Sequence, residues 1–274
     1  SGFIGSAVSN LLQKSNHQIF LTSRGNRPGY IELNLSNRSR DRATLEEIEP
    51  DIAVNFSWNT RGRNYLESGQ NIDSLNWNVS LFQILKEISL KKLISIGSAA
   101  EYTARENLDE KNIEAKNGDS LYAETKLEAS KQMKHIFAET DCELVWVRLF
   151  QAYGRGQDSQ RLIPTLLKYA QNRETFRLRQ PNTYLDWINV LDIANSIKFL
   201  IENEAPHFVE IGTGEATSNL ELCSLFSRYV GLNFELASDF HQTESFRIAS
   251  RNSFLIRMCP PEINLEAYIG ELNR

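Results

Sequence analysis

The sequence predicts an α/β fold built on a doubly wound parallel sheet, and two observations carry this prediction. Short apolar runs typical of buried strands recur along the chain, and amphipathic segments of helical length lie between most of them. The predicted strands are Gln18–Thr22, Tyr30–Leu33, Ile52–Phe56, Leu93–Ile96, Leu144–Leu149 and His207–Ile211. Predicted helices include Leu75–Ile88 and Leu121–Phe137. Strands that alternate with helices indicate parallel pairing, because each return to the sheet needs a crossover.

The first residues, SGFIG, lead directly into a helical pattern that ends near Asn16, and the predicted strand Gln18–Thr22 follows. A glycine-rich turn, a helix and a strand in this order are typical of the first unit of a dinucleotide-binding Rossmann fold, here without its first strand. Gly2 and Gly5, with Phe3 and Ile4 between them, would bring backbone N–H groups close to a phosphate at the helix N-terminus. The spacing alone also fits a plain turn, and the helix and strand that follow favour nucleotide binding.

Composition excludes several classes of protein. The chain has 274 residues, 41% of them hydrophobic, with a net charge of −5, which argues against a nucleic-acid or anionic-membrane partner. No apolar run approaches the roughly 18 residues of a membrane span. Three cysteines without CxxC spacing and four scattered histidines argue against a disulfide framework and a metal site, so we expect a cytoplasmic protein.

The regular alternation weakens after Gly154. We therefore expect a Rossmann core of residues 1–155 and 186–212. A small interleaved C-terminal lobe, residues 156–185 and 213–274, would bind the substrate.

Three residues are candidates for catalysis. Tyr122 and Lys126 lie four apart on a predicted helix and so share one face. An ammonium beside a phenol favours the tyrosinate and would lower the pKa of Tyr122. This spacing is common by chance. Ser98 supports a catalytic role, because it follows the predicted strand Leu93–Ile96, and ligands bind at the carboxyl ends of strands in open α/β sheets.

Together these motifs resemble the extended short-chain dehydrogenases/reductases of the NAD-dependent epimerase/dehydratase family, which act on nucleotide sugars. Ser98, Tyr122 and Lys126 match the family's catalytic triad. Further matches are Arg148–Gly154 (RLFQAYG), Asp186–Asp192 (DWINVLD), Glu210–Gly214 (EIGTG) and Asn78–Val79. The resemblance implies that an intact protein has one more strand before residue 1, and it implies a possible homodimer through Leu75–Ile88 and Leu121–Phe137.

For the cofactor, the resemblance favours NADP(H), with NAD(H) possible. Family members that prefer NAD end their second strand with a carboxylate, where this chain has Ser23 and Arg24, and a guanidinium suits a 2′-phosphate. The alternative is that Arg24 points into solvent. The resemblance places adenine near Asn34 and Leu35. It also assigns to the cofactor Ser57, Trp58, Tyr122, Lys126 and Phe150.

For the substrate, a nucleotide sugar, the resemblance implies contacts from Asn78, Ser98, Gln151, Arg161, Arg177 and Arg179. The family often has arginine where Leu185 stands, and the three arginines are candidates to replace it; a solvated basic edge is the alternative for them.

The reaction expected from the resemblance is NADPH-dependent reduction of a nucleotide-linked 4-keto-deoxysugar, with Tyr122 as the proton donor. Ala99 and Ala100 stand where family dehydratases carry an acid pair, which argues against dehydration. An NAD-dependent nucleotide-sugar 4-epimerase is the alternative. A non-catalytic NADP-binding regulator is a second one, although such proteins commonly lose the tyrosine or the lysine.

Overall fold

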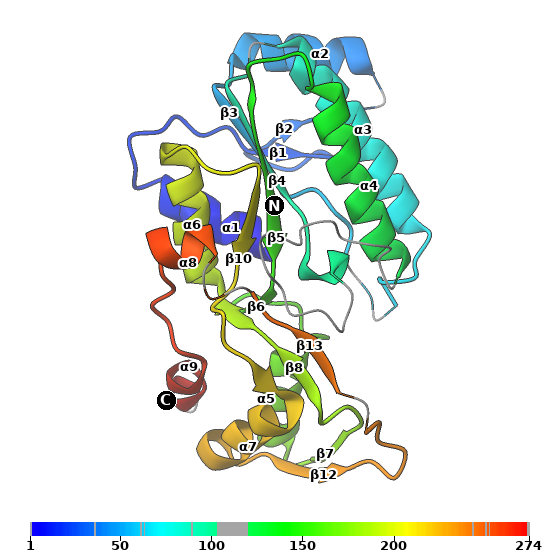
Figure 1. Ribbon diagram of the computed structural model, residues 1–274, viewed down its shortest axis with the longest axis vertical. Helices are drawn as coiled ribbons and strands as arrows, with labels where there is room; N and C mark the ends of the chain where they lie inside the picture. Colours follow the sequence, from blue (N-terminus) through cyan, green and yellow to red (C-terminus); the bar gives the residue numbers. More distant parts are fainter. Residues whose placement is uncertain are drawn as a thin grey trace.

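A four-stranded parallel sheet forms the centre of the molecule (Figure 1). The computed structural model describes residues 2–35, 37–60, 62, 64–88, 90–102, 120–242, 244–249, 251 and 253–272. The strands are β3 (Ile52–Asn55), β4 (Lys92–Ile96), β5 (Glu143–Leu149) and β10 (Phe208–Ile211), in the order β10-β5-β4-β3. The two inner strands read KLISI and ELVWVRL, the near-continuous apolar runs that burial on both faces requires. The predicted α/β class with a parallel sheet is confirmed.

Helices cover both faces of this sheet (Figure 1). On one face lie α1 (Phe3–Leu12) and α6 (Val190–Glu202), which share an apolar cluster with Ile94 and Val145. On the other lie α2 (Arg38–Ile48), α3 (Gln70–Glu87) and α4 (Leu121–Ile136), packed around Leu93 and Trp146. Within the described residues, no helix is both long enough and apolar enough to cross a membrane.

Two of the predicted strands are much shorter than the sequence indicates. They become β1 (Thr22–Ser23) and β2 (Ile31–Glu32), which pair in parallel as a separate two-stranded sheet. Phe20 is exposed and Leu21 is half-buried. An apolar sequence predicts a strand, but a ladder of hydrogen bonds also needs a neighbouring strand along its whole length.

The second region lies below the sheet in Figure 1 and has its own apolar core, which includes Leu166, Leu222 and Phe226. Its elements are α5 (Leu162–Asn172), β7 (Thr175–Leu178), β8 (Thr183–Leu185), β11 (Thr217–Ser218), α7 (Asn219–Val230), β12 (Asn233–Leu236), β13 (Ser245–Arg247) and α9 (Leu265–Glu271). Between the two regions, β6 (Gln151–Tyr153) pairs with β9 (Trp187–Asn189). The late helix α8 (Phe254–Met258) returns to the sheet, where Leu255 joins the apolar cluster of α1 and α6.

Asp186, at the start of the DWINVLD motif, ties the two regions together. Its fully buried carboxylate accepts hydrogen bonds from the Thr213 backbone N–H (2.7 Å) and hydroxyl (2.7 Å), the Gly214 N–H (2.8 Å) and the Ala249 N–H (3.1 Å). Burial raises the pKa of this carboxyl even though the four donors lower it. The motif therefore fixes the turn after β10 and the segment after β13.

Asp186→Asn is expected to lower the free energy of unfolding by about 2 kcal/mol, because an amide cannot accept from donors on both sides and leaves some unpaired. Urea denaturation followed by circular dichroism measures this change. Glu235→Gln serves as the control, since Glu235 forms an exposed pair with Arg177 and its loss should cost less than about 0.5 kcal/mol. Equal effects of the two substitutions would contradict the role given to Asp186.

Candidate functional site

Helix α4 carries Tyr122 and Lys126 one turn apart on its buried face. The helix begins after Ser120, whose hydroxyl accepts a hydrogen bond from the Ala123 N–H (3.2 Å) and caps the first turn. The Tyr122 N–H donates to the Leu66 carbonyl (2.8 Å). Tyr122 therefore sits at a helix start that is fixed both by its own cap and by the loop after β3.

The carboxyl end of β4 brings Ser98 to the same place. Ser98 precedes the short 3₁₀ helix η1 (Ala99–Glu101), and its hydroxyl accepts from the Ala100 N–H (3.1 Å). The Ser98 side chain lies close enough to the Tyr122 phenol to lower the pKa of that phenol. The Lys126 ammonium donates to the Ile96 carbonyl at the last residue of β4 (2.6 Å). The structure therefore brings the three predicted catalytic side chains together, and their roles in catalysis stay predictions.

Two aromatic rings cover this group. The Trp58 and Tyr65 rings meet the Tyr122 ring edge-on, with centroids 6.3 Å and 5.3 Å away. The Lys126 ammonium lies 3.9 Å from the centre of the Trp58 ring, a cation–π contact. The buried Asn71 amide fixes the Trp58 ring and the Tyr65 backbone, because it accepts from the Trp58 indole N–H (3.0 Å) and donates to the Tyr65 main-chain carbonyl (2.7 Å). Trp58 thus contacts the predicted catalytic lysine directly.

Burial dominates the ionisation of the site. It raises the pKa of Tyr122, assisted by Tyr65 and opposed by the hydrogen bond from Ser98. Burial also lowers the pKa of Lys126 to about 7, and the nearby Glu101 carboxylate opposes this shift. The expectation that the lysine lowers the pKa of the tyrosine is therefore wrong for this structure, because both side chains are desolvated beneath aromatic rings.

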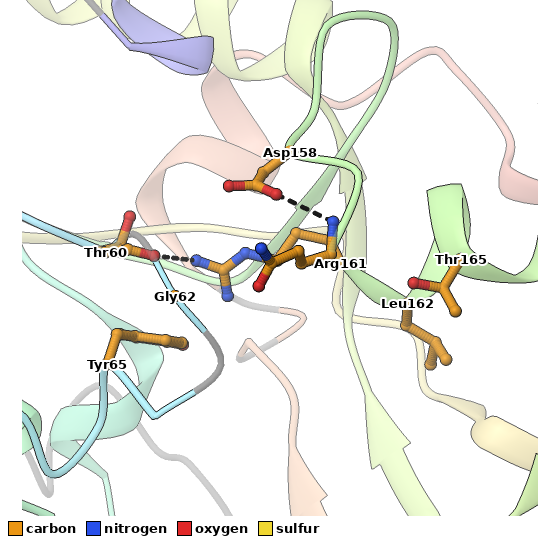
Figure 2. Close-up of a pocket in the computed structure, with 8 residues that line it drawn as sticks. Thr60, Gly62, Tyr65, Asp158, Arg161, Leu162 and Thr165 are labelled. Atoms are coloured by element: carbon orange, nitrogen blue, oxygen red, sulfur yellow. Dashed lines mark hydrogen bonds between the residues drawn. The ribbon is translucent and has the colours of Figure 1, made fainter.

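A pocket of about 310 Å³ opens beside Tyr65, between the loop after β3 and the start of α5 (Figure 2). Arg161, one of the predicted substrate ligands, lies at its centre. The Arg161 guanidinium is 4.5 Å from the centre of the Tyr65 ring and donates to the Thr60 carbonyl (3.0 Å). The pocket is lined by Thr60, Gly62, Tyr65, Asp158, Gln160, Arg161, Leu162 and Thr165. Tyr65 therefore lies between Tyr122 and a pocket that holds both Arg161 and Asp158.

The start of α1 fits the phosphates of a dinucleotide. Gly2 caps the helix without a side-chain hydrogen bond, the first turn contains no acidic residue, and Gly5 is buried behind it. A Cβ at Gly2 would meet no atom within 4 Å, and its backbone is extended, so the protein's own packing does not require glycine there. An uncapped helix start with open space in front suits an anion. Phe3 and Ile4, the half-buried residues between the glycines, form the first turn.

On the adenosine side, Ser23 ends β1 and the Arg24 guanidinium lies over the Trp77 ring at 5.2 Å. Arg24 is exposed as a residue although its guanidinium lies against α3, and partial burial lowers its pKa. Asn34 donates to Glu32 (2.8 Å). Leu35 has a positive φ of 58°, and its N–H donates to the buried Asp41 carboxylate (2.7 Å). At the position where adenine was expected, the Leu35 N–H is therefore engaged by the protein.

Asn55, Ser57 and Asn78, at and beside the end of β3, are hydrogen-bonded to one another. Asn78 is buried; its amide oxygen accepts from Asn55, and its amide nitrogen donates to the carbonyls of Ser57 (2.9 Å) and Ser74 (2.7 Å). The Ser57 N–H and hydroxyl both donate to Asn55. In this conformation Asn78 positions the loop that carries Trp58, and its predicted contact with substrate would require these bonds to change.

The remaining predicted site residues lie in two places. Phe150 is buried against Tyr102, and Gln151 is half-buried at the start of β6. Arg177 and Arg179 do not line the pocket around Arg161. Arg177 pairs with Glu235 (3.0 Å) and Arg179 lies near Asp239 (3.9 Å), both pairs exposed on the second region. Of the three predicted arginines, Arg161 alone lines the pocket, and Arg177 and Arg179 lie in solvent opposite carboxylates.

Sequence reasoning missed Tyr65 and Glu101. Tyr65 lies in a polar loop with no periodic pattern, so only the folded chain reveals that it covers Tyr122. Glu101 did leave a signal, because it is a charged residue within the small-residue turn GSAAEY directly after a buried strand. Its side chain is fully buried, next to Ser98.

The chain belongs to the NAD dependent epimerase/dehydratase family, whose family model matches residues 1–212. Among characterised proteins, it is 26% identical over 181 residues to a UDP-glucose 4-epimerase from Cyamopsis tetragonoloba. That alignment covers 56% of this chain and 50% of the relative, so the chain spans about half the length of the relative it matches.

Solved structures share the fold. The UDP-N-acetylglucosamine 4-epimerase from Bacillus cereus superposes with a TM-score of 0.83 over 100% of this chain and 92% of its own, at 16% identity. The UDP-glucose 4-epimerase from Thermus thermophilus, solved with NAD, gives a TM-score of 0.82 over 98% and 94% at 16% identity. Together with the family match, they establish the Rossmann-type architecture.

Because the pKa of Lys126 is lowered in the folded protein, the free energy of unfolding should depend on pH, and Lys126→Met should remove this contribution. Folded Lys126 loses its proton near pH 7, whereas the unfolded chain keeps it up to the ordinary lysine pKa, so between these values the unfolded state binds more protons and stability rises with pH. The free energy of unfolding of the wild type, minus that of the variant, should therefore rise by roughly 2 kcal/mol from pH 7 to pH 9, at about 1.36 kcal/mol per unit.

Urea titrations at several pH values measure this difference. The exposed Lys131 on the same helix supplies the control, and Lys131→Met should leave the pH dependence unchanged. A flat difference between the wild type and Lys126→Met would show that the ammonium is not desolvated.

Proposed function

We propose that the protein is an NADPH-dependent reductase of a nucleotide-linked 4-keto-deoxysugar. The observation that carries this proposal is the meeting of Ser98, Tyr122 and Lys126 at the carboxyl end of β4, beside a pocket that holds Arg161. A hydroxyl beside a phenol suits a carbonyl oxygen, and a guanidinium in the adjoining pocket suits a diphosphate.

A nicotinamide dinucleotide, when bound, supplies the hydride for this reduction. The start of α1 at Gly2 is the proposed seat of its pyrophosphate, since an uncapped helix N-terminus attracts anions. Lys126 is proposed to contact the cofactor as well; for this the Trp58 ring must move away from the ammonium, which it now covers.

The protein's own groups handle the proton. The pKa of Tyr122 is raised by burial, so at neutral pH the phenol carries the proton that a reduced carbonyl oxygen needs. Ser98, whose side chain lies beside that phenol, would orient the same oxygen. Lys126 has a pKa of about 7, so its ammonium form is available at neutral pH. The positive charge would stabilise the tyrosinate that forms as the proton leaves Tyr122.

Reduction is favoured over dehydration because Ala99 and Ala100, on η1 directly after Ser98, have no group that can exchange a proton. The 4-epimerase remains a second candidate, since the Cyamopsis relative is a UDP-glucose 4-epimerase. Arg24 favours the reductase, because a guanidinium directly after β1 suits the 2′-phosphate of NADPH. An enzyme that holds NAD tightly would instead be expected to carry a carboxylate at this position.

We also propose the division of labour between the two regions. Residues 1–155 and 186–212 would hold the dinucleotide, and residues 156–185 and 213–274 would contribute to the sugar nucleotide site, with α8 as an exception because it packs on β10. The expected homodimer through α3 and α4 stays a prediction.

The reductase is tested with a panel of nucleotide-linked 4-keto-sugars and NADPH, whose oxidation is followed by absorbance. Tyr122→Phe should lower kcat at least about a hundredfold, because the proton donor is lost, while dinucleotide binding persists. Purified protein that already carries NAD and interconverts nucleotide sugars without added NADPH would instead identify the epimerase. Unchanged activity of Tyr122→Phe would contradict both enzymes.

Cofactor choice is tested by Arg24→Ala. The KM for NADPH should rise about tenfold, with that for NADH changed less than about twofold, because only NADPH carries the 2′-phosphate that the guanidinium would pair with. Arg27→Ala, a change in the same loop that removes a guanidinium stacked on Tyr30, is the matched control. Equal effects on the two cofactors would argue against a 2′-phosphate site at Arg24.

A further inference from the structure

Glu101 is a fully buried carboxylate directly beneath the proposed catalytic group. Its Oε1 accepts from the Ser98 backbone N–H at 2.7 Å, and the Ser98 hydroxyl in turn caps η1. Its Oε2 accepts from the Arg148 Nε–H at 3.0 Å. The indole N–H of Trp146 is shared between both oxygens, at 3.2 Å and 3.0 Å. Oε1 therefore binds mainly the Ser98 backbone, and Oε2 binds mainly Arg148.

Close packing and paired charges surround the carboxylate. A Cβ at Gly97 would overlap both Glu101 and Trp146, so glycine is required where β4 passes the carboxylate. On the other side, the Arg148 guanidinium lies 4.5 Å from the centre of the Tyr102 ring, and Tyr102 donates to Glu210 (2.7 Å). A buried charge persists only when it is paired and hydrogen-bonded in this way.

Glu101 is not placed to exchange a proton with a substrate. Its side chain has no exposed surface, and its contacts run toward Arg148 and Trp146 on β5. Its contact with the site runs through the Ser98 backbone. Because the Ser98 N–H and hydroxyl belong to one reciprocal capping arrangement, the carboxylate fixes the orientation in which the hydroxyl reaches Tyr122.

We propose that Glu101 is a positioning residue that holds the Ser98 hydroxyl against Tyr122 through the Ser98 N–H. This inference rests on the proposed function, since Ser98 matters to turnover only if the reaction is the one proposed. Misplacing a catalytic group by as little as an ångström can cost about a hundredfold in rate. Loss of the carboxylate should therefore act on kcat and leave dinucleotide affinity unchanged.

The test is a double-substitution cycle in the full chain, with kcat measured in the NADPH assay. Glu101→Ala should lower kcat about tenfold, and in a Ser98→Ala background it should lower kcat less than about twofold further, because Glu101 acts through Ser98. Glu101→Gln keeps an oxygen for the Ser98 N–H and should retain most of the wild-type kcat. Dinucleotide affinity, measured by fluorescence titration, should be the same in all of them.

Glu210→Gln is the matched control. It removes the charge of a second buried carboxylate near Arg148, one that accepts a hydrogen bond from Tyr102. It should lower the thermal midpoint of unfolding without the tenfold loss of kcat. Additive losses for Glu101→Ala and Ser98→Ala, or an equal loss of kcat in Glu210→Gln, would overturn the proposal in favour of a merely structural role.

A readout that does not depend on turnover separates this inference from the proposed function. In protein labelled with ¹⁵N-serine, the amide proton of Ser98 should resonate far downfield because it bonds to a carboxylate, and Glu101→Ala should move it upfield while Glu210→Gln leaves it in place. An unmoved Ser98 signal in Glu101→Ala overturns the inference. A wild type inactive on every substrate, with the predicted shift present, overturns the proposed function alone.

Discussion

The hydrogen bond from the Lys126 ammonium to the Ile96 carbonyl joins the helix that carries Tyr122 to the strand end that carries Ser98. This contact requires three things at once: β4 in the interior of the sheet, α4 packed across it, and a lysine one helical turn after the tyrosine. The bond lies in an apolar setting beneath Trp58, so it is electrostatically strong, but the ammonium is costly to keep charged. The arrangement of the proposed catalytic group follows from this one constraint.

Buried charges recur where the chain must be held accurately. Asp186 fixes the turn after β10 to the segment after β13, and Glu101 fixes the Ser98 turn to β5 through Arg148. Each carboxylate receives several donors, which offset the desolvation of its charge. The junction of the two regions needs such fixed joints, because apolar packing alone tolerates small shifts more readily than a network of buried charges.

Much of the fold could be predicted from the sequence, for identifiable reasons. The strands of the main sheet are buried on both faces and have apolar sequences. By contrast, β1 and β2 are shorter than predicted, because the length of a strand also depends on the strands that pair with it. The spacing of Tyr122 and Lys126 and the strand end before Ser98 are local signals. The contact of Trp58 with Lys126 joins residues far apart in the chain and has no local signal. The same limit explains Arg177 and Arg179: their sequence shows positive charge, but only the fold shows the carboxylates they face.

We propose that Tyr122, Ser98 and Lys126 serve a hydride transfer to a sugar carbonyl. Its most direct measurement is mass spectrometry of the product formed from a nucleotide-linked 4-keto-sugar and NADPH that carries deuterium at the transferable position of its nicotinamide. The expected result is a 4-hydroxy product that has gained a single deuterium, formed by the wild type and lost in Tyr122→Phe. A product without deuterium, or labelled product formed equally well by Tyr122→Phe, would contradict it.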